Sequence, residues 1–361
     1  MRRLIVVSRV LKIMDRIIRV LVVDDSAYVR KVVRQMLSRS PFIEVVGAAR
    51  DGDEALQMVE QLKPDVVTCD LIMPGMDGTA FVREQMARMP LPIVIVSIAN
   101  ESGELALAAL DAGAIDFVQK PTALATEKIF EVNDELIEKV KAAANVSINH
   151  LHSPFARGTV ETIEPAPVAR AGLIDIIVLG ISTGGPQALK YLIPQLPADL
   201  AVPMAVVLHM PVGYTEMYAR KLDEMSRLKV IEARQGDPVE PGVMLLAPAG
   251  RHLSFTRNEN GKVEAHLDSR PFDTPHRPSV DVLFKSAAET FRNRTLGVVM
   301  TGMGMDGKQG SAWIKAQGGI VFTEAQETCV VYGMPCAVDE AGLSDRSVPL
   351  GQMARAIMEV V

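Results

Sequence analysis

The segment IRVLVVDD, residues 18–25, starts with a largely apolar run and ends with two adjacent carboxylates. A short apolar run of this kind is typical of a strand buried on both faces of a parallel sheet. Further along, four more such runs alternate with amphipathic segments as far as residue 143. This alternation predicts a five-stranded parallel α/β sheet with helices on both faces. The predicted strands are Ile18–Asp25, Glu44–Ala49, Asp65–Cys69, Ile93–Ser97 and Asp116–Gln119, and the predicted helices are Tyr28–Ser38, Glu54–Leu62, Thr79–Arg88, Leu105–Ala112 and Glu127–Ala143.

A second α/β pattern begins near residue 173 with the buried-strand run IDIIVLG, residues 174–180. Between the two patterns, residues 145–171 contain scattered Pro, Ser, Thr and Gly and no sustained period, which is typical of a flexible linker. His150 and His152 in this stretch fit solvated linker residues better than a metal site. We therefore predict one α/β domain over residues 17–143, a linker over 144–172 and a doubly wound α/β parallel-sheet domain over 173–361. Further predicted elements of the second domain are the strands Ala201–His209, Thr295–Gly302 and Gly318–Ala325 and the helices Tyr214–Met225 and Val280–Phe291.

The composition restricts the class of protein. The 361 residues carry a formal net charge of −6, which argues against a nucleic-acid partner bound through general charge. No apolar stretch reaches the roughly 18 residues that suggest a spanning helix, so we expect no direct membrane insertion. The 3 cysteines make no disulfide framework, and we expect reduced thiols in a cytoplasmic protein. Residues 1–16 are predicted to be an N-terminal extension, with Met14 as a second candidate start.

Three carboxylates follow predicted strands of the first domain. Asp24 and Asp25 end the first strand, and Asp70 ends the third. Chemistry in a doubly wound sheet collects at the carboxyl ends of the strands, so these acids are expected to share one crevice. Clustered carboxylates need a cation, and an all-oxygen site suits Mg²⁺. Lys120 directly follows the fifth predicted strand and Ser97 ends the fourth, so both side chains could reach the same crevice. Taken singly, each acid could instead be a solvated strand end or a helix cap.

Together these residues form a specific set: DD at the first strand, DLIMPGMDG at residues 70–78, a serine at the end of the fourth strand and Lys120 before a proline. The set resembles the receiver domains of two-component response regulators across residues 17–143. The resemblance implies a flavodoxin-like fold in which a histidine kinase phosphorylates Asp70. It also implies Mg²⁺ held by Asp24, Asp25, Asp70 and the backbone carbonyl of Ile72, phosphoryl-oxygen contacts from Ser97 and Lys120, and an aromatic switch at Phe117.

The second domain offers the parts of a serine hydrolase. Residues 180–184, GISTG, satisfy G-x-S-x-G, a strand-to-helix turn that exposes Ser182. A nucleophilic serine needs a base and an acid that orients the base. His209 and Asp306 each follow a predicted strand, on the same sheet edge as the serine. A phosphate-binding turn is a rival reading of the glycines, Asp306 could merely shape a turn, and His252 and His276 are rival bases.

Three longer segments narrow this choice: GISTGGP at residues 180–186, LHMPVGYT at 208–215 and VVMTGMGMDG at 298–307. With TCVVYGMP at 328–335, they resemble the catalytic domain of chemotaxis protein-glutamate methylesterases over about residues 173–361. The resemblance implies Ser182 as nucleophile, His209 as base and Asp306 as orienting acid. It further implies Thr183 beside the serine and a backbone oxyanion donor at Met303. Cys329 and Cys336 are a rival nucleophile or redox pair, and structural thiols are the simpler interpretation.

The two resemblances together imply a phosphorylation-activated esterase. It would hydrolyse glutamyl methyl esters on methyl-accepting chemoreceptors, release methanol and deamidate receptor glutamines. Mg²⁺ would serve the receiver alone, hydrolysis would need no cofactor, and the chain is expected to be a monomer. Phosphorylation of Asp70 would relieve occlusion of the active site. Two rivals are a binding-only output domain and a DNA-binding regulator, although the second domain has no helix-turn-helix-like pair and no basic recognition stripe.

Overall fold

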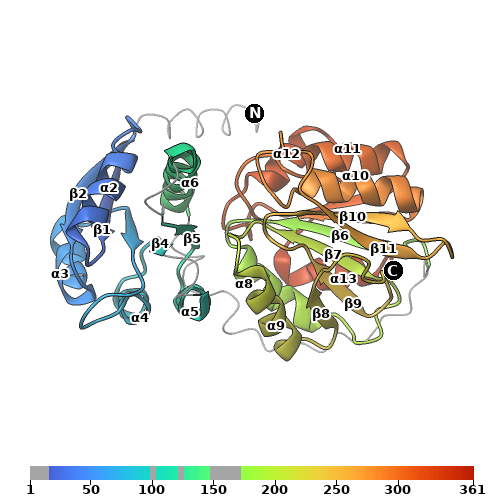
Figure 1. Cartoon of the computed structure of the whole chain (residues 1–361), viewed down its shortest axis with the longest axis horizontal. Helices are drawn as coiled ribbons and strands as arrows, with labels where there is room; N and C mark the ends of the chain where they lie inside the picture. Colours follow the sequence, from blue (N-terminus) through green and yellow to red (C-terminus); the bar gives the residue numbers. More distant parts are fainter. Residues whose placement is uncertain (1–15, 98–102, 121–125, 147–171) are drawn as a thin grey trace. The chain divides into compact units, whose positions relative to one another are not determined.

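The computed structural model describes residues 16–97, 103–120, 126–146 and 172–361 (Figure 1). The chain divides into two compact units, Met1–Ser153 and Pro154–Val361. Almost all of the predicted N-terminal extension and most of the predicted linker, including His150 and His152, lie outside the described residues.

The first unit is an α/β fold around one parallel sheet, in the order β2-β1-β3-β4-β5. Three of its helices begin at a capping side chain: Ser26, Asp51 and Asp77 each accept a hydrogen bond from a backbone N–H group in the first turn that follows. This arrangement confirms the predicted five-stranded fold. The strands are β1 (Ile18–Val23), β2 (Ile43–Ala49), β3 (Val66–Cys69), β4 (Ile93–Ser97) and β5 (Asp116–Gln119), and the helices are α2 (Ala27–Leu37), α3 (Gly52–Leu62), α4 (Gly78–Arg88), α5 (Gly103–Ala112) and α6 (Thr126–Ala144).

The second unit contains a seven-stranded sheet in the order β14-β13-β12-β6-β7-β9-β8. All of its strand pairs are parallel, as predicted. A separate antiparallel hairpin, β10 (His252–Arg257) with β11 (Val263–Asp268), lies outside this sheet. The strands of the sheet are β6 (Ile176–Ile181), β7 (Met204–Leu208), β8 (Lys229–Glu232), β9 (Val243–Leu246), β12 (Thr295–Val299), β13 (Ile320–Glu324) and β14 (Arg346–Val348).

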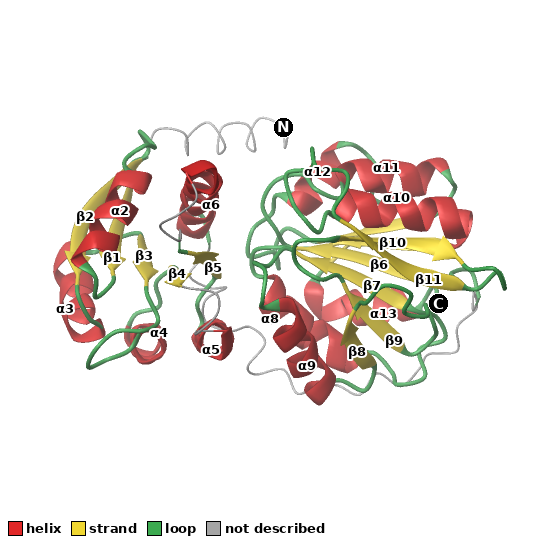
Figure 2. Ribbon diagram, in the orientation of Figure 1, coloured by secondary structure: helices red, strands yellow, loops and turns green. Residues whose placement is uncertain are grey.

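Helices cover both faces of this larger sheet (Figure 2). In that view α10, α11 and α12 lie on one side of the strands, and α8, α9 and α13 on the other. No helix in the described parts of the chain is long and apolar enough to cross a membrane. The helices are α8 (Gly185–Leu192), α9 (Thr215–Met225), α10 (Val280–Phe291), α11 (Lys308–Ala316), α12 (Met334–Glu340) and α13 (Leu350–Met358), with 3₁₀ turns at Ile193–Gln195 and Arg292–Arg294.

The connectivity gives each sheet one point where the chain turns to opposite sides. In the first unit β1 lies between β2 and β3, and in the second β6 lies between β7 and β12. The carboxyl ends of strands at such a point flank a crevice where parallel sheets bind ligands and carry out chemistry. Asp24 and Asp70 follow β1 and β3, and Ser182 and His209 follow β6 and β7. Topology alone therefore brings the predicted site residues of each unit to one edge of its sheet.

Candidate active site and phosphorylation site

The backbone around Ser182 is fixed on both sides of the residue. β6 ends at Ile181, and the Ser182 N–H donates to the carbonyl of Thr301 at 3.0 Å. The Ser182 carbonyl accepts from the N–H of Gly185 at 2.7 Å, at the start of α8. Between them Gly184 has φ +78°, a left-handed conformation that costs glycine little. The turn thus presents Ser182 at the positive end of a helix, next to the neighbouring strand β12.

His209 lies beside this turn because β7 pairs with β6. The His209 N–H donates to the carbonyl of Ile181 at 3.1 Å. Its ring Nε2 lies 2.9 Å from Asp306 Oδ2, and its side chain is 9% exposed. The other ring nitrogen, Nδ1, is buried and has no hydrogen-bond partner among the described residues. With Nε2 held by the carboxylate, Nδ1 is the nitrogen left to exchange a proton.

Asp306 is a buried carboxylate held by five donors. Besides His209, its oxygens accept from the Ser279 hydroxyl (3.0 Å) and from the N–H groups of Val280 (2.8 Å), Asp281 (2.9 Å) and Gly307 (3.1 Å). Val280 and Asp281 form the first turn of α10, where free N–H groups and the helix dipole favour an anion. Burial alone would raise the pKa of Asp306, but the contacts with His209 and these N–H groups outweigh burial and lower it. The carboxylate therefore stays ionised against the imidazole.

The loop after β12 connects Asp306 to the serine turn. The Thr301 hydroxyl donates to the carbonyl of Thr183 at 3.0 Å, and the Thr301 N–H donates to Glu324 Oε2 at 2.9 Å. Gly302 packs so closely on Ser182 that a Cβ atom at this position would lie 2.8 Å from the serine Cβ. Thr183 is buried, and Met303, the next residue of the loop, is half-buried. Both residues predicted to flank the oxyanion thus belong to segments packed against Ser182.

The rival histidines occupy different places. His252 is 1% exposed, accepts from the Ser279 N–H through Nδ1 at 3.1 Å, and has Nε2 3.1 Å from the Pro271 carbonyl. Both ring nitrogens are therefore used for structure. His276 is stacked on the ring of His209, with centroids 4.1 Å apart and planes at 24°. It belongs to the site, but as a neighbour of His209.

The rival cysteines are free thiols. Cys329 is 3% exposed, and burial raises its pKa. Burial, followed by the charge of Glu340, also raises the pKa of Cys336. A nucleophilic cysteine needs the opposite shift, so these environments favour structural thiols.

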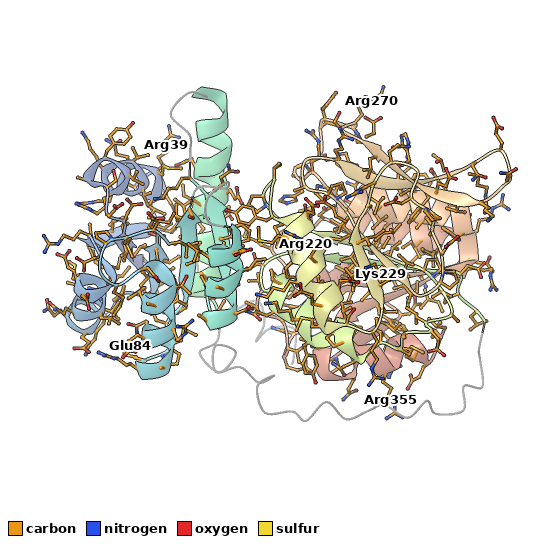
Figure 3. All side chains as sticks on the ribbon, turned by 60° about the horizontal axis from the view of Figure 1, so that its bottom comes forward. Arg39, Glu84, Arg220, Lys229, Arg270 and Arg355 are labelled. Atoms are coloured by element: carbon orange, nitrogen blue, oxygen red, sulfur yellow. The ribbon has the colours of Figure 1, made fainter. Side chains whose placement is uncertain are left out.

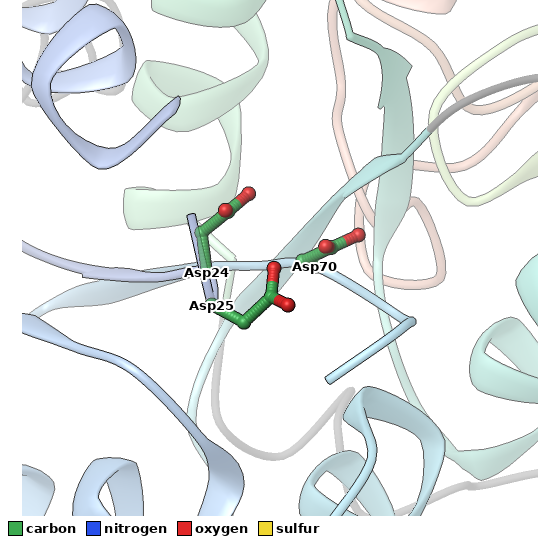
Figure 4. A group of neighbouring side chains, drawn as sticks. All are labelled: Asp24, Asp25 and Asp70. Atoms are coloured by element: carbon green, nitrogen blue, oxygen red, sulfur yellow. The ribbon is translucent and has the colours of Figure 1, made fainter. Parts of the chain in front are cut away.

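In the first unit three carboxylates converge beyond β1 and β3 (Figure 4). The ligand oxygens of Asp24, Asp25 and Asp70 lie within 4.8 Å of one another. Lys120 Nζ lies 2.7 Å from Asp24 Oδ2 and 2.6 Å from Asp70 Oδ2. Burial alone would lower the pKa of Lys120, but its hydrogen bonds to the two carboxylates raise it. Three acids share one ammonium, so hard oxygen donors and excess negative charge remain, a set that fits Mg²⁺.

The remaining predicted residues of this unit lie around the carboxylates. Ser97 is 2% exposed at the end of β4, and its carbonyl accepts from the Lys120 N–H at 2.8 Å. Phe117 on β5 is 3% exposed, with Lys139 Nζ 5.8 Å from the centre of its ring. Ile72 follows Asp70 by two residues, and its side chain is exposed. The roles of these residues in phosphorylation stay predictions.

Three further residues of the site, Ser279, Thr301 and Glu324, were not predicted as functional from the sequence. Ser279 was detectable as a serine directly before a helical pattern, which is a cap signal. Thr301 lies within the quoted segment of residues 298–307, and Glu324 is a carboxylate near the end of the predicted strand Gly318–Ala325. What the sequence does not display is that β12 and β13 bring Thr301 and Glu324 together, 23 residues apart.

Both units match known protein families. Residues 177–357 match the family described as CheB methylesterase, and residues 20–131 match the response regulator receiver domain. The chain is 50% identical over 338 residues to a protein-glutamate methylesterase/protein-glutamine glutaminase of Myxococcus xanthus, covering 93% of this chain and 96% of the relative. A relative of the same name from Symbiobacterium thermophilum is 43% identical, with 96% and 98% covered. The solved catalytic domain of Thermotoga maritima CheB methylesterase is 42% identical with a TM-score of 0.51, covering 52% of this chain and 99% of that domain.

Proposed function

Because the chain belongs to the CheB family of protein-glutamate methylesterase/protein-glutamine glutaminases, we propose that it hydrolyses glutamyl methyl esters on chemoreceptors by a Ser-His-Asp mechanism. The observation that carries this mechanism is the 2.9 Å contact between His209 Nε2 and Asp306 Oδ2, one strand away from the turn of Ser182. Asp306 is proposed to fix the orientation of the imidazole and to stabilise its positive charge. Ser182 is proposed as the nucleophile.

In the proposed first step, the Ser182 hydroxyl attacks the γ-carbonyl carbon of the ester, and its proton moves to His209 Nδ1. The resulting oxyanion is assigned to backbone N–H groups at Thr183 and Met303, next to the N-terminus of α8. Collapse of the tetrahedral species breaks the bond to the methoxy oxygen. His209 returns the proton to that oxygen, so methanol leaves and an acyl-serine remains.

The second step reverses the first with water in place of the alcohol. His209 takes a proton from water, the hydroxide attacks the acyl carbon, and the proton returns to the Ser182 oxygen. The products are a receptor glutamate and the free enzyme. A glutamine side chain presents the same carbonyl and would release ammonia by the same route, which is the glutaminase activity. Every proton transfer in this scheme belongs to His209, so no cofactor is assigned to hydrolysis.

The first unit is proposed as the regulator of this activity. Asp70 would accept a phosphoryl group from a chemotaxis histidine kinase. Asp24, Asp25, Asp70 and the Ile72 carbonyl would hold Mg²⁺, which neutralises phosphoryl charge when bound. Ser97 and Lys120 would contact the phosphoryl oxygens. The side chain of Phe117 would then change its rotamer as part of activation. We propose that this change shifts the conformational population of the unit and relieves inhibition of the esterase.

The setting of the proposed reaction is cytoplasmic. The free thiols among the described residues fit a reducing compartment. The substrates would be the methylated chemoreceptors themselves, and the active form is proposed to be a monomer.

The esterase mechanism is tested by methanol release from methylated chemoreceptor membranes. Wild type is expected to release methanol, and Ser182→Ala is expected to release none above background. Ser269→Ala changes an exposed serine of the same unit and serves as the matched control. Full activity of Ser182→Ala would exclude the serine as nucleophile.

A further inference from the structure

The segment Thr274–Pro278, TPHRP, crosses the active site without a role in the proposed chemistry. His276 stacks on His209, and the next residue but one after Pro278 is Val280, whose N–H holds Asp306. The carbonyl of Arg277 accepts from the Gly250 N–H at 3.0 Å, which fixes the backbone of this segment. Arg277 is thus carried at a defined position, one residue from the imidazole that touches the proposed base.

The Arg277 guanidinium is half-buried and has no acid partner among the described residues. Its Nε is fully covered and has no hydrogen-bond acceptor in that part of the chain. Leaving a buried charged donor unpaired costs more than leaving a neutral one, so such a group is normally paired or awaits a ligand. A guanidinium presents a planar fork of donors that matches a carboxylate.

The neighbouring carboxylates are already engaged. Two carboxylates close enough to His252 to influence its charge are Asp306 and Asp268, and neither forms an ion pair with Arg277. Asp306 is held by His209, and Asp268 is paired with Arg270 at 3.0 Å. Arg270 itself points to the outside of the second unit (Figure 3). The fold therefore supplies Arg277 with no internal counter-ion from this group.

Phe272 gives the guanidinium a surface to lie on. The guanidinium carbon is 5.2 Å from the centre of the Phe272 ring, and Phe272 is 68% exposed. Contact with an aromatic face orients the plane of the guanidinium and leaves its edge for hydrogen bonds. A large exposed aromatic beside an unpaired cation is the composition of a contact surface for an acidic peptide.

From these contacts we propose that Arg277 binds a carboxylate of the substrate protein close to the ester that is hydrolysed. The ester carbonyl is neutral and its oxyanion has backbone donors, so the guanidinium is assigned to a neighbouring acidic side chain. Arg277 directly follows His276, whose ring stacks on the proposed base His209, so the guanidinium belongs to the surroundings of the active site. On a helical substrate, side chains three or four residues apart lie on the same face, about 5–6 Å apart at Cβ, so we assign the acidic side chain to one of these positions relative to the ester. The inference rests on the proposed function and adds a preference for esters flanked by Glu or Asp.

The test separates binding from turnover. Full-length Ser182→Ala protein, with acetyl phosphate and Mg²⁺, is titrated into two fluorescein-labelled helical peptides that carry one glutamate methyl ester. One peptide has glutamates three and four residues from the ester, and the other has glutamines there. Arg277→Gln in this background is expected to weaken binding of the acidic peptide by about 10- to 100-fold, the range of one charge-assisted hydrogen bond. Binding of the glutamine peptide is expected to stay within about twofold.

Two further variants sharpen the result. Arg277→Lys keeps the charge but loses the planar fork, so its affinity for the acidic peptide should fall between those of Arg277 and Arg277→Gln. Arg251→Gln changes an exposed arginine of the same unit and should bind both peptides like its parent. In the catalytically intact chain, Arg277→Gln should raise KM for the acidic peptide and leave kcat nearly unchanged.

Three results would overturn the proposal: equal weakening of both peptides, no weakening of either, or no preference of the parent protein for the acidic peptide. Equal weakening would mean that Arg277 only supports the fold, which thermal unfolding followed by circular dichroism would register. A chain that binds the acidic peptide through Arg277 but releases no methanol would contradict the proposed esterase and leave this inference intact.

Discussion

Replacement of Glu324 by glutamine should remove a pH dependence of stability from the second unit. Glu324 is 0% exposed at the end of β13. Its oxygens accept from the Thr301 N–H at 2.9 Å and from the Thr328 hydroxyl at 3.0 Å. Burial raises the pKa of Glu324 from 4.5 to about 7, although these two hydrogen bonds act in the opposite direction. Glutamine has nearly the same shape, can accept from Thr301 and is neutral at every pH.

The size of the stability change follows from how tightly Glu324 holds its proton in the folded and in the unfolded chain. The folded state holds the Glu324 proton more tightly than the unfolded chain, so this group stabilises the fold fully below pH 4.5. That contribution is lost as the pH rises through about 7. At about 1.4 kcal/mol per tenfold change in proton affinity, the interval between 4.5 and about 7 corresponds to about 3 kcal/mol. Relative to the variant, wild type should lose on the order of 3 kcal/mol between pH 4.5 and pH 8.

The assay is urea unfolding at several pH values, followed by tryptophan fluorescence. The chain has 1 tryptophan, Trp313 on α11, which reports the second unit without a signal from the first. Subtracting wild type from Glu324→Gln cancels groups that titrate in both proteins, such as Asp281, whose pKa burial raises to about 6. The exposed Glu259→Gln serves as a control and should show a flat difference. A flat difference for Glu324→Gln as well would refute the account of this buried carboxylate.

Three other changes have directions fixed by the structure. Asp306→Asn should lower kcat by about 10³- to 10⁴-fold in a methanol-release assay, because the neutral amide cannot hold the charged imidazole; a loss below tenfold would contradict its role. Gly302→Ala should lower kcat for methanol release by more than its loss of thermal stability explains, because the new Cβ would lie 2.8 Å from the Ser182 Cβ. An unchanged kcat would contradict this close packing. Lys120→Met should bind Mg²⁺ more tightly in calorimetric titration, because the ammonium no longer neutralises Asp24 and Asp70. The same variant should not be stimulated by acetyl phosphate. Weaker Mg²⁺ binding would contradict the proposed site.

The central strands were predictable because they carry their own signal. β1 and β6 are apolar runs buried on both faces, and each ends in polar residues that follow directly along the chain. The edge strands β8 and β14 lack such runs, because one side of each faces solvent: Lys229, Arg346 and Ser347 are exposed. In the second unit, the strands that position the site were therefore predictable, and β8 and β14 were not. The inner strand β9 was also missed, because its apolar run is only four residues long.

For the candidate site, the positions of the main residues along the strands were predictable, and many of their contacts were not. The position of Ser182, His209 and Asp306 after three neighbouring strands follows from topology, and the structure brings His209 and Asp306 into contact. Their catalytic roles stay predictions until tested. The attachment of Asp306 to the first turn of α10, the stack of His276 on His209 and the hold of Glu324 on Thr301 depend on residues 23 to 67 positions apart. Such pairings depend on how the elements pack, which periodicity does not encode.

The most direct test of the account is methanol release from methylated chemoreceptor membranes with and without acetyl phosphate and Mg²⁺. Wild type should be stimulated by the phosphodonor, Asp70→Asn should keep basal release without stimulation, and Ser182→Ala should release no methanol in either condition. Asp53→Asn, a change at an exposed acid of the same unit as Asp70, should respond like wild type. Full stimulation of Asp70→Asn, or methanol release by Ser182→Ala, would contradict the claim that an aspartyl phosphate in the first unit controls a serine esterase in the second.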